Sequence, residues 1–497
     1  MSYGMVSIAL NINSYQRCIS LQTDKTDAAF VKKQNSLMKS NTKQIMLKAF
    51  LLFSITLLTF CKKNDDPIRP DASYAQYGTP FTNVPNTKDA VMYQVNLRAF
   101  SNDANFKGVT ARMDSIKALG INVVYLMPVY PVGVLKSAGG LGSPYAVKDY
   151  KAVNPEFGTL EDLRNLVNAA HERNMAVMLD WVAGHTSWDN AWINDKSWYK
   201  QDVNGNIIPP AGTNWSDVAA LDYNKKEMRL AMIDAMKYWV FNANVDGFRC
   251  DAADFVPLDF WKEANDAMKG ITTHKLMMLA EGTRADHFKA GFQMVYGFGY
   301  YSTLQSRIFG NGSSATLLQD LNTSEYAQAL PGTQVVRYTT NHDVYHTDGS
   351  PVNIYGGKTG SMSAFLVTAY MKGVPMLYNG QEVGCTRPID FFYRTPIDWS
   401  TNPDMKAEYK KIIGFRNSSE AVRSGDLSVY SSDNVAVFTK TGAGQQVLVV
   451  ASLRANTTTY VVPAALQGVW KNAFTGATVT LGSQLYLQSF QHMVLTK

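Results

Sequence analysis

The chain has 497 residues, of which 46% are hydrophobic and 18% charged, and this composition excludes a largely disordered protein. At about 150 residues per domain, the length predicts two or three domains, or one large barrel with attached parts. Residues 1–60 hold seven Lys/Arg and two Asp, which leaves 40 basic and 39 acidic side chains in the rest of the chain. Such a nearly neutral chain has no electrostatic footprint for nucleic acid, so we expect no nucleic-acid partner.

A short apolar segment, MLKAFLLFSITLLTF at residues 46–60, follows a basic stretch and ends directly before Cys61. It has the length of a signal-peptide core and is shorter than a typical membrane-spanning helix. The segment resembles a bacterial lipoprotein signal, in which the cysteine becomes the lipidated first residue, although Phe60 stands where a small residue is usual. The resemblance implies a protein exported by a Gram-negative bacterium and anchored to a membrane through Cys61, in the periplasm or on the cell surface. An uncleaved anchor helix is the alternative, and translation starts at Met1 or Met38.

From residue 90 onward, short β-branched or aromatic segments alternate with amphipathic helical segments such as 160–174. This alternation is typical of βα units around a parallel sheet. Eight units over about 300 residues favour a (β/α)8 TIM barrel, an α/β fold, over an open doubly wound sheet. No GxGxxG motif follows a strand, so a dinucleotide-binding fold has no support. The predicted strand segments are 91–100, 121–130, 175–185, 245–253, 276–282, 294–300, 335–343 and 374–384.

Two departures from this repeat define further parts of the chain. The long connection after the third strand predicts a small inserted domain at about 186–224, because long loops in compact domains are usually functional or carry structure of their own. After residue 420 the pattern changes to short alternating segments, which predict a C-terminal antiparallel β-sandwich domain. Four tryptophans of the insert either line a cleft or pack its interior: Trp188, Trp192, Trp198 and Trp215. The predicted parts are therefore an extension with signal peptide (1–61), a linker (62–88), the barrel with its insert (89–420) and the sandwich (421–497).

Polar residues at the carboxyl ends of barrel strands face the mouth of a TIM barrel, where active sites lie. The fourth strand segment ends with Arg249 and Asp251, which are two residues apart and therefore on the same face. The fifth ends with Glu281, and the seventh with His342 and Asp343. Three carboxylates thus reach one rim from three strands, which suits glycoside hydrolysis or divalent-metal catalysis. No HxH or HExxH pair accompanies the acids, which disfavours a metal-dependent hydrolase.

A retaining glycosidase uses one carboxylate as nucleophile and a carboxylic acid about 5–5.5 Å away. The pKa of the acid must be raised by its surroundings while that of the nucleophile stays low. We therefore expect Arg249 to keep Asp251 ionised.

The motifs DWVAGH, GFRCDAA, LAEG and TTNHD, in this order and spacing, resemble the four motif regions of the α-amylase family, glycoside hydrolase family 13. The segments SPYAVKDYKAVNPEFGT and GQEVG are similar to flanking segments of that family, and the resemblance covers about residues 88–497. It implies that Asp251 is the nucleophile and Glu281 the general acid and base. It also implies that Asp343 holds the 2- and 3-hydroxyls of a distorted sugar.

The same resemblance implies a set of substrate-binding residues. His185 and His342 would form hydrogen bonds with sugar hydroxyls, and Tyr145 would stack under that sugar. Arg249 would orient the nucleophile, and Arg394 would contact the sugar in the next subsite.

Two positions depart from the usual pattern of the family. Gly184 stands where many members have an asparagine that ligates calcium, and CDAADF replaces the usual Lys-His pair after the nucleophile. We therefore expect no required cofactor, and Gly184 disfavours a structural calcium ion. The segment CDAADFVPLDFW is closer to cyclomaltodextrinases and neopullulanases, although residues 62–88 are too few to form their extra N-terminal domain.

The sequence thus predicts a retaining hydrolase of α-1,4-glucosidic bonds, whose substrate is an α-glucan such as starch or a maltooligosaccharide. A transglycosylase or isomerase of the same family carries the same motifs and is an alternative, because it passes the glycosyl group to a sugar hydroxyl in place of water. A non-catalytic glycan-binding lipoprotein is a further alternative, but such a protein should have lost one of the carboxylates. Nothing in the sequence indicates an oligomeric state.

Overall fold

The computed structural model describes residues 74–497. The predicted N-terminal extension and signal peptide, Cys61 and the first part of the predicted linker lie outside the described residues. Among the residues that are described, no helix combines the length and the apolar character needed to cross a membrane.

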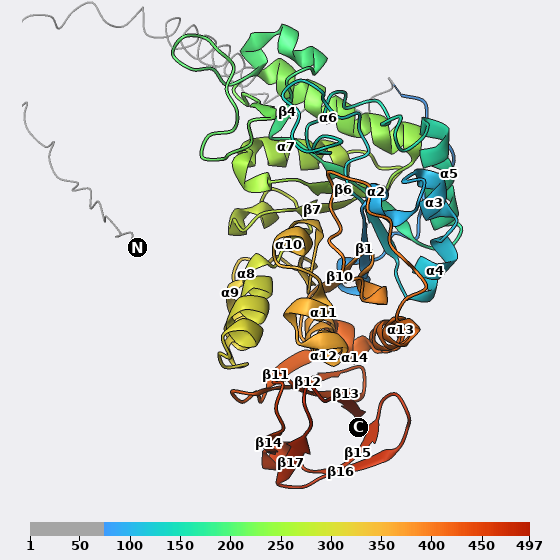
Figure 1. The fold of residues 1–497 in the computed structure, drawn as a ribbon, viewed down its shortest axis with the longest axis vertical. Coiled ribbons are helices and arrows are strands. Elements are labelled where there is room, and N and C mark those ends of the chain that lie inside the picture. The colour runs from blue at the N-terminus through green and yellow to red at the C-terminus, as the bar shows by residue number, and fades with distance from the viewer. Residues whose placement is uncertain (1–73) are drawn as a thin grey trace, which may run out of the picture. The chain divides into compact units, whose positions relative to one another are not determined.

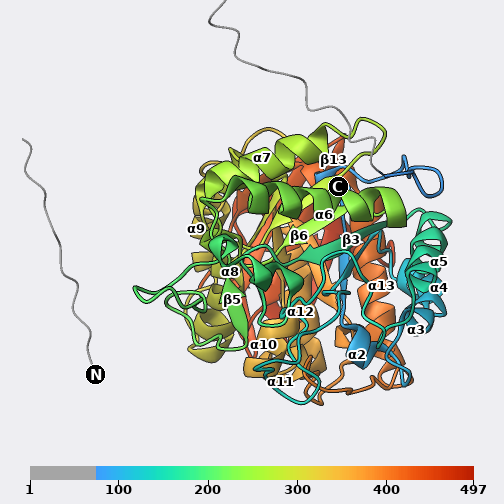
Figure 2. The same cartoon turned by 90° about the horizontal axis from the view of Figure 1, so that it is seen from above.

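Within residues 74–497, eight parallel strands close into a barrel with helices around it (Figures 1 and 2). The barrel strands pair in chain order, and the first and last close the ring through the pair Met92↔Met376. The eight predicted strand segments and the predicted (β/α)8 TIM barrel are confirmed. The strands are β1 (Met92–Val95), β2 (Val123–Leu126), β3 (Ala176–Trp181), β6 (Gly247–Cys250), β7 (Met277–Ala280), β8 (Met294–Tyr296), β9 (Gln334–Tyr338) and β10 (Val374–Tyr378).

Several of the helices begin at a side-chain cap and bury one face in the apolar core. The helix after β2, for example, begins with a capping box in which Thr159 and Asp162 each bond the other's backbone N–H. Its buried face holds Leu163, Leu166 and Val167. The helices are α2 (Leu97–Phe100), α3 (Phe106–Thr110), α4 (Met113–Ala118), α5 (Leu160–His171), α6 (Lys226–Ala243), α7 (Leu258–Lys269), α8 (Phe298–Ser302), α9 (Leu317–Ser324), α10 (His342–Thr347), α11 (Pro351–Ile354), α12 (Gly357–Tyr370), α13 (Pro403–Ser418) and α14 (Glu420–Ser424).

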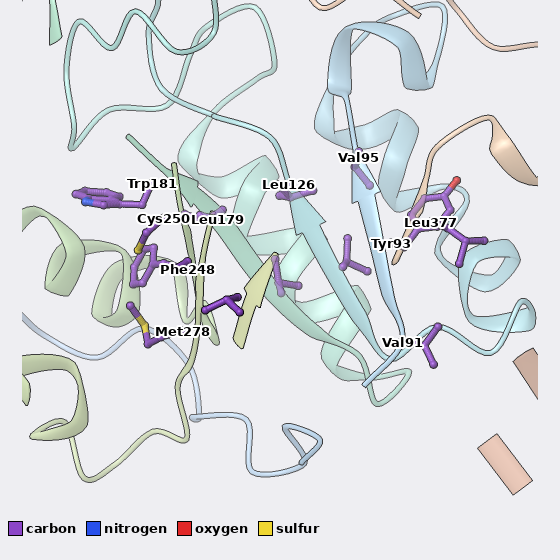
Figure 3. Close-up of a cluster of buried hydrophobic side chains, with 14 of the residues drawn as sticks. Val91, Tyr93, Val95, Leu126, Leu179, Trp181, Phe248, Cys250, Met278 and Leu377 are labelled. Carbon is purple, nitrogen blue, oxygen red and sulfur yellow. The ribbon is translucent and has the colours of Figure 1, made fainter. Parts of the chain in front are cut away.

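Side chains alternate between the outer and inner faces of the barrel strands. Outward-facing residues such as Tyr93, Leu179 and Phe248 belong to one large hydrophobic cluster together with residues of the surrounding helices (Figure 3). Inward-facing residues such as Met92 and Met178 form a second apolar cluster inside the barrel. Both clusters consist of side chains that are almost fully buried, so the barrel is a packed core.

The interior of the barrel becomes polar toward the carboxyl ends of the strands. Gln94 lies two residues beyond Met92 on β1, and Asp180 lies two residues beyond Met178 on β3. Arg249 of β6 pairs in register with Asp180, and all three polar side chains are buried. An apolar floor therefore supports a layer of buried polar groups directly below the mouth of the barrel.

Strand β6 can approach β7 closely because it begins with glycine. Gly247 has a φ of +152°, and a Cβ on it would lie 1.9 Å from the carbonyl oxygen of Met277. The pair Gly247↔Met277 starts the register of β6 on β7, and this register continues through Arg249↔Leu279. The glycine therefore fixes the height at which Arg249 enters the barrel interior.

The insert after β3 contains a small hairpin-like sheet of β4 (His185–Ser187) and β5 (Val218–Ala220). Trp192 packs between Trp198, at a ring distance of 5.3 Å, and Tyr150, at 4.9 Å. The ring of Trp188 lies 3.4 Å from the ammonium group of Lys136. These three tryptophans therefore pack the insert.

The residues after α14 form a six-stranded antiparallel sheet and a two-stranded antiparallel sheet around a common apolar core that includes Trp470. This confirms the predicted C-terminal antiparallel domain, which is red in Figure 1. Helix α14 continues past the expected boundary at residue 420, so the first strand begins only at Asp426. The strands are β11 (Asp426–Val429), β12 (Val435–Gly442), β13 (Gln445–Ser452), β14 (Thr458–Val461), β15 (Gly468–Asn472), β16 (Thr478–Leu481), β17 (Gln484–Leu487) and β18 (His492–Thr496).

Candidate active site

A cavity of about 370 Å³ opens at the carboxyl ends of the barrel strands. This volume lies in the range of pockets that bind small organic ligands. The predicted site residues that line it are Tyr145, His185, Asp251, Glu281, His342 and Asp343. Segments far apart in the sequence therefore meet at one cavity, as the strand order predicts.

Arg249 lies beneath this cavity and is fully buried. Its Nη1 donates to Asp180 Oδ1 at 2.6 Å and to Asp251 Oδ1 at 2.8 Å, and its Nη2 donates to Glu281 Oε1. One guanidinium group thus bonds three carboxyl groups from three strands, and it holds the predicted nucleophile and the predicted acid in fixed positions.

Burial raises the pKa of Asp251 well above its ordinary value, and the carboxylates of Glu281 and Asp180 raise it further. Burial likewise raises the pKa of Asp180 to about 6. Arg249 lowers the pKa of Asp251, in the direction that we expected, but its one positive charge does not offset burial and the carboxylates of Glu281 and Asp180. The group of acids holds a proton at higher pH than an isolated aspartate would.

Glu281 is held by the turn that follows the nucleophile. Ala252 adopts a left-handed conformation with a φ of +41°, and its N–H donates to Glu281 Oε2 at 2.8 Å. The next N–H, of Ala253, donates to the backbone oxygen of Glu281 at 2.8 Å. A left-handed conformation costs an alanine about 1–2 kcal/mol. Strain of this kind often marks functional sites, and here it places Asp251 and Glu281 side by side.

Asp343 lies in the first turn of α10, and its side chain is 52% exposed. The side chain of Asn341 caps this helix by accepting from the N–H groups of Asp343 and Val344, both at 3.0 Å. A capped helix N-terminus favours a carboxylate in the first turn. The cap therefore orients Asp343 at the cavity wall, where it can meet sugar hydroxyls.

Tyr145 and His342 lie side by side, with ring centres 5.5 Å apart and planes inclined by 25°. The Tyr145 hydroxyl is 2.6 Å from His342 Nε2 and donates to Asp180 Oδ2 at 3.1 Å. Burial lowers the pKa of His342 to about 3 and that of His185 to about 4. Both imidazoles are therefore neutral near pH 7, so each has one donor and one acceptor for hydrogen bonds.

The structure does not bring Arg394 to the cavity. Its side chain is 48% exposed, and its Nε lies 3.5 Å from Glu156 Oε1. Phe391 and Phe392, from the same segment, line the cavity instead. The predicted contact of Arg394 with a sugar in the next subsite is therefore not supported, because a carboxylate outside the cavity holds the guanidinium.

Two further residues belong to the site, although the sequence assigned neither of them a definite role there. Asp180 is fully buried and accepts from the Tyr125 hydroxyl at 2.6 Å in addition to its bond with Arg249. A lone aspartate within the apolar segment AVMLDW was a usable signal for it. Trp215 also lines the cavity, with its ring 5.6 Å from that of His185, and nothing in the sequence separated it from the three packing tryptophans.

Gly184 has no side chain that could ligate a metal ion. A Cβ on Gly184 would meet only Val256, at 4.0 Å, so the site offers space but no donor side chain. The oxygens of the nearby Asp254 accept from the N–H of Thr283 at 2.8 Å and contact His287 Nε2 at 2.7 Å. Among residues 74–497, no group of three or more His, Cys, Asp or Glu side chains is arranged to hold a metal ion. The residues present do not fit a calcium ion there.

Two carboxyl groups that face a sugar-sized cavity at the mouth of a TIM barrel are the arrangement with which glycoside hydrolases act. The protein is an enzyme of this class. A family model described as the α-amylase catalytic domain matches residues 77–206 and 213–472. The chain therefore belongs to the α-amylase family, glycoside hydrolase family 13.

Solved structures and a curated relative agree with this assignment. The structure of an α-amylase from Lactobacillus plantarum is 28% identical with a TM-score of 0.75, and the match covers 82% of this chain and 99% of that one. A noncanonic maltogenic α-amylase from Thermotoga neapolitana is 26% identical with a TM-score of 0.74, over 83% and 99% of the two chains. Neopullulanase 2 from Thermoactinomyces vulgaris is 24% identical over 85% of this chain and 80% of its own length.

The charge balance around Arg249 predicts opposite effects of two substitutions on stability. Arg249→Met should lower the free energy of unfolding at pH 7 by about 3–5 kcal/mol, because it leaves several buried carboxyl groups without their cation. Asp251→Asn should leave it unchanged or raise it, because the wild-type carboxyl has a raised pKa and is unfavourable when ionised in the folded state. Urea denaturation measures the free energy of unfolding of both variants. An equal loss of stability in the two variants would contradict this account of the charges around Arg249.

Proposed function

We propose that the protein is a retaining α-glucan hydrolase that cleaves α-1,4-glucosidic bonds in starch-like polysaccharides or maltooligosaccharides. The supporting observation is that Asp251 and Glu281 both bond Arg249 and both line one cavity at the barrel mouth. A nucleophile and an acid held by the same cation have the fixed relative position that a two-step displacement requires.

In the proposed mechanism, Asp251 attacks the anomeric carbon while Glu281 protonates the leaving glycosidic oxygen, which gives a covalent glycosyl-enzyme. Glu281, now a carboxylate, then removes a proton from the water that attacks the same carbon and releases Asp251. Tyr145 offers its ring face to the sugar. Asp343 accepts hydrogen bonds from the hydroxyls of the distorted ring and thereby favours the transition state.

Transglycosylation is the second candidate, and one observation favours it. Phe255 is 53% exposed, and its ring lies 5.6 Å from that of Trp215 at the edge of the cavity. Phe255 follows the nucleophile by four residues. The residue before it, Asp254, accepts a hydrogen bond from the N–H of Thr283 in the loop after Glu281. An aromatic surface next to the acid can bind an acceptor sugar, which would then compete with water for the glycosyl-enzyme.

Product analysis tests the proposed hydrolysis. Soluble starch, pullulan, cyclodextrin and maltotriose should yield short maltooligosaccharides whose newly formed ends are α-anomers when observed by NMR at early times. Asp251→Asn and Glu281→Gln should each lower kcat by at least about 10³-fold, because each removes a group that forms or breaks bonds. Arg394→Ala is the matched control and should retain activity.

Products that are longer than the substrate, or isomerised products, would indicate that the enzyme is a transglycosylase or isomerase. Binding of glucan without turnover in the wild type would contradict both enzymatic functions and indicate a glycan-binding protein.

We further propose that the enzyme needs no structural calcium near Gly184. Treatment with EDTA should leave both the rate of starch hydrolysis and the Tm unchanged. Gly184→Asn should acquire no calcium dependence, because a Cβ at this position would meet only the apolar side chain of Val256, and one added amide would find no carboxylate partner there. A loss of activity or Tm on chelation that added calcium restores would show that the proposal is wrong.

We also propose that the protein is exported and anchored by lipid at Cys61, on the periplasmic side or the surface of a Gram-negative cell. This rests on the apolar segment at residues 46–60 that ends before the cysteine. After expression in a Gram-negative host, the wild type and the control Cys385→Ser should sediment with membranes and incorporate labelled palmitate. Cys61→Ser should incorporate none; incorporation equal to that of the wild type would exclude this anchor.

A further inference from the structure

Gln94 is a fully buried side chain on β1 that points into the barrel interior below the cavity. Both ends of its amide form hydrogen bonds with the same residue, His342, which lies 248 residues later in the sequence. Oε1 accepts from the backbone N–H of His342 at 3.3 Å, and Nε2 lies 2.8 Å from His342 Nδ1. A buried amide therefore holds the backbone and the ring of one histidine together.

These two bonds determine which ring nitrogen of His342 carries the proton. A backbone N–H can only donate, so it must face the amide oxygen, and this leaves the NH2 group of Gln94 facing Nδ1. The NH2 group can only donate, so Nδ1 accepts. A neutral imidazole with an accepting Nδ1 has its single proton on Nε2.

We propose that Gln94 is a positioning residue that fixes His342 in its Nε2–H form and so sets the direction of the hydrogen bonds below the cavity. The effect on catalysis rests on the function proposed above, whereas the protonation of the ring does not.

The contacts of Nε2 agree with this assignment. Nε2 lies 2.6 Å from the Tyr145 hydroxyl oxygen and 3.3 Å from Asp343 Oδ1. A proton on Nε2 faces two acceptors, whereas a lone pair there would face the carboxylate of Asp343 and repel it. Because the Tyr145 oxygen accepts a hydrogen bond from His342 Nε2–H, the Tyr145 hydroxyl hydrogen is free to form the hydrogen bond to Asp180.

The bonds then run in one direction, from Gln94 through His342 and Tyr145 to Asp180. Asp180 in turn bonds Arg249, which holds Asp251 and Glu281. The ring of Tyr145 is thereby kept in one orientation at the cavity. We infer that the amide of Gln94 controls the orientation of groups that contact the sugar, although it does not contact the sugar itself.

The charged groups around His342 have opposite effects on the pKa of its ring. Burial and Arg249 lower the pKa of His342, whereas Glu281 raises it. Asp343, at 3.3 Å from Nε2, also faces the ring, together with the neutral hydroxyl of Tyr145. Gln94 adds a donor at Nδ1, where a second proton would have to bind, and so favours the neutral ring.

Gln94→Glu is the most informative variant because it keeps the shape and replaces the NH2 donor with an acceptor. The introduced carboxylate still accepts from the backbone N–H of His342, but its other oxygen needs a proton between itself and Nδ1. Below a new apparent pKa the pair holds this extra proton and Nε2 keeps its own. Above that pKa the ring's single proton moves to Nδ1, and Nε2 faces Asp343 with a lone pair.

We expect kcat/KM of Gln94→Glu, divided by that of the wild type, to fall as the pH rises through this new ionisation. The ratio should be near one on the acid side and about 10–100-fold lower on the alkaline side, the size of loss that is seen when the hydrogen-bond partner that orients a metal-ligating histidine is removed. Gln94→Met removes both bonds and should lower kcat/KM without adding an ionisation to the profile. A constant ratio for Gln94→Glu across the pH range would overturn the inference.

Nitrogen NMR of ¹⁵N-histidine-labelled protein tests the protonation without any substrate, with the His342 signals identified by their absence in His342→Gln. The wild type should show a protonated Nε2 and an unprotonated Nδ1 throughout the range in which it is folded. Gln94→Glu should show a protonated Nδ1 at alkaline pH. If the wild type has its proton on Nδ1, the inference is wrong; if the NMR result holds but no glucan is cleaved, only the proposed function fails.

Discussion

The site depends on one buried positive charge. A guanidinium group inside a barrel is costly by several kcal/mol unless opposite charges and hydrogen bonds surround it, so Arg249 requires carboxylates close by. Asp180 and Asp251 bond one of its terminal nitrogens and Glu281 the other. Because these acids come from β3, β6 and β7, the charge balance also fixes the relative heights of three neighbouring strands. Gly247 permits this arrangement, since its missing side chain lets β6 lie against the start of β7.

The same balance explains why the acids differ from isolated carboxylates. More negative than positive groups surround the guanidinium, and water is largely excluded, so the group of acids retains a proton at higher pH. Hydrolysis with retention needs one protonated and one ionised carboxyl group, and a cluster of acids that shares a proton can supply both. The raised pKa of Asp251 is therefore a property of the cluster: burial and the neighbouring carboxylates raise this pKa, and Arg249 lowers it only in part.

Rigid supports hold the groups that face the cavity. Ala252 in its left-handed turn bonds Glu281, Asn341 caps the helix that carries Asp343, and Gln94 holds the ring of His342. None of these three supports is itself a group that reacts. Ala252 donates its own backbone N–H, Asn341 accepts from backbone N–H groups, and Gln94 bonds both the backbone N–H and a ring nitrogen of His342. Backbone N–H groups therefore take part in all three supports. Precise placement of this kind requires supporting residues that are themselves fixed by packing and hydrogen bonds.

The sequence by itself determined the barrel, its eight strands, the C-terminal antiparallel domain and the convergence of Asp251, Glu281 and Asp343. These follow from hydrophobic periodicity and from strand order, which are local properties of the chain and place strand ends at a common rim. Only the tertiary structure decided that Phe391 and Phe392 face the cavity while Arg394 turns to Glu156, and that Trp215 lines the site while three other tryptophans pack. It also decided the pKa of Asp251 and the role of Gln94. Each of these depends on burial and on partners distant in sequence, because the solvation of a charge and the direction of a hydrogen bond are set by what surrounds a group in space.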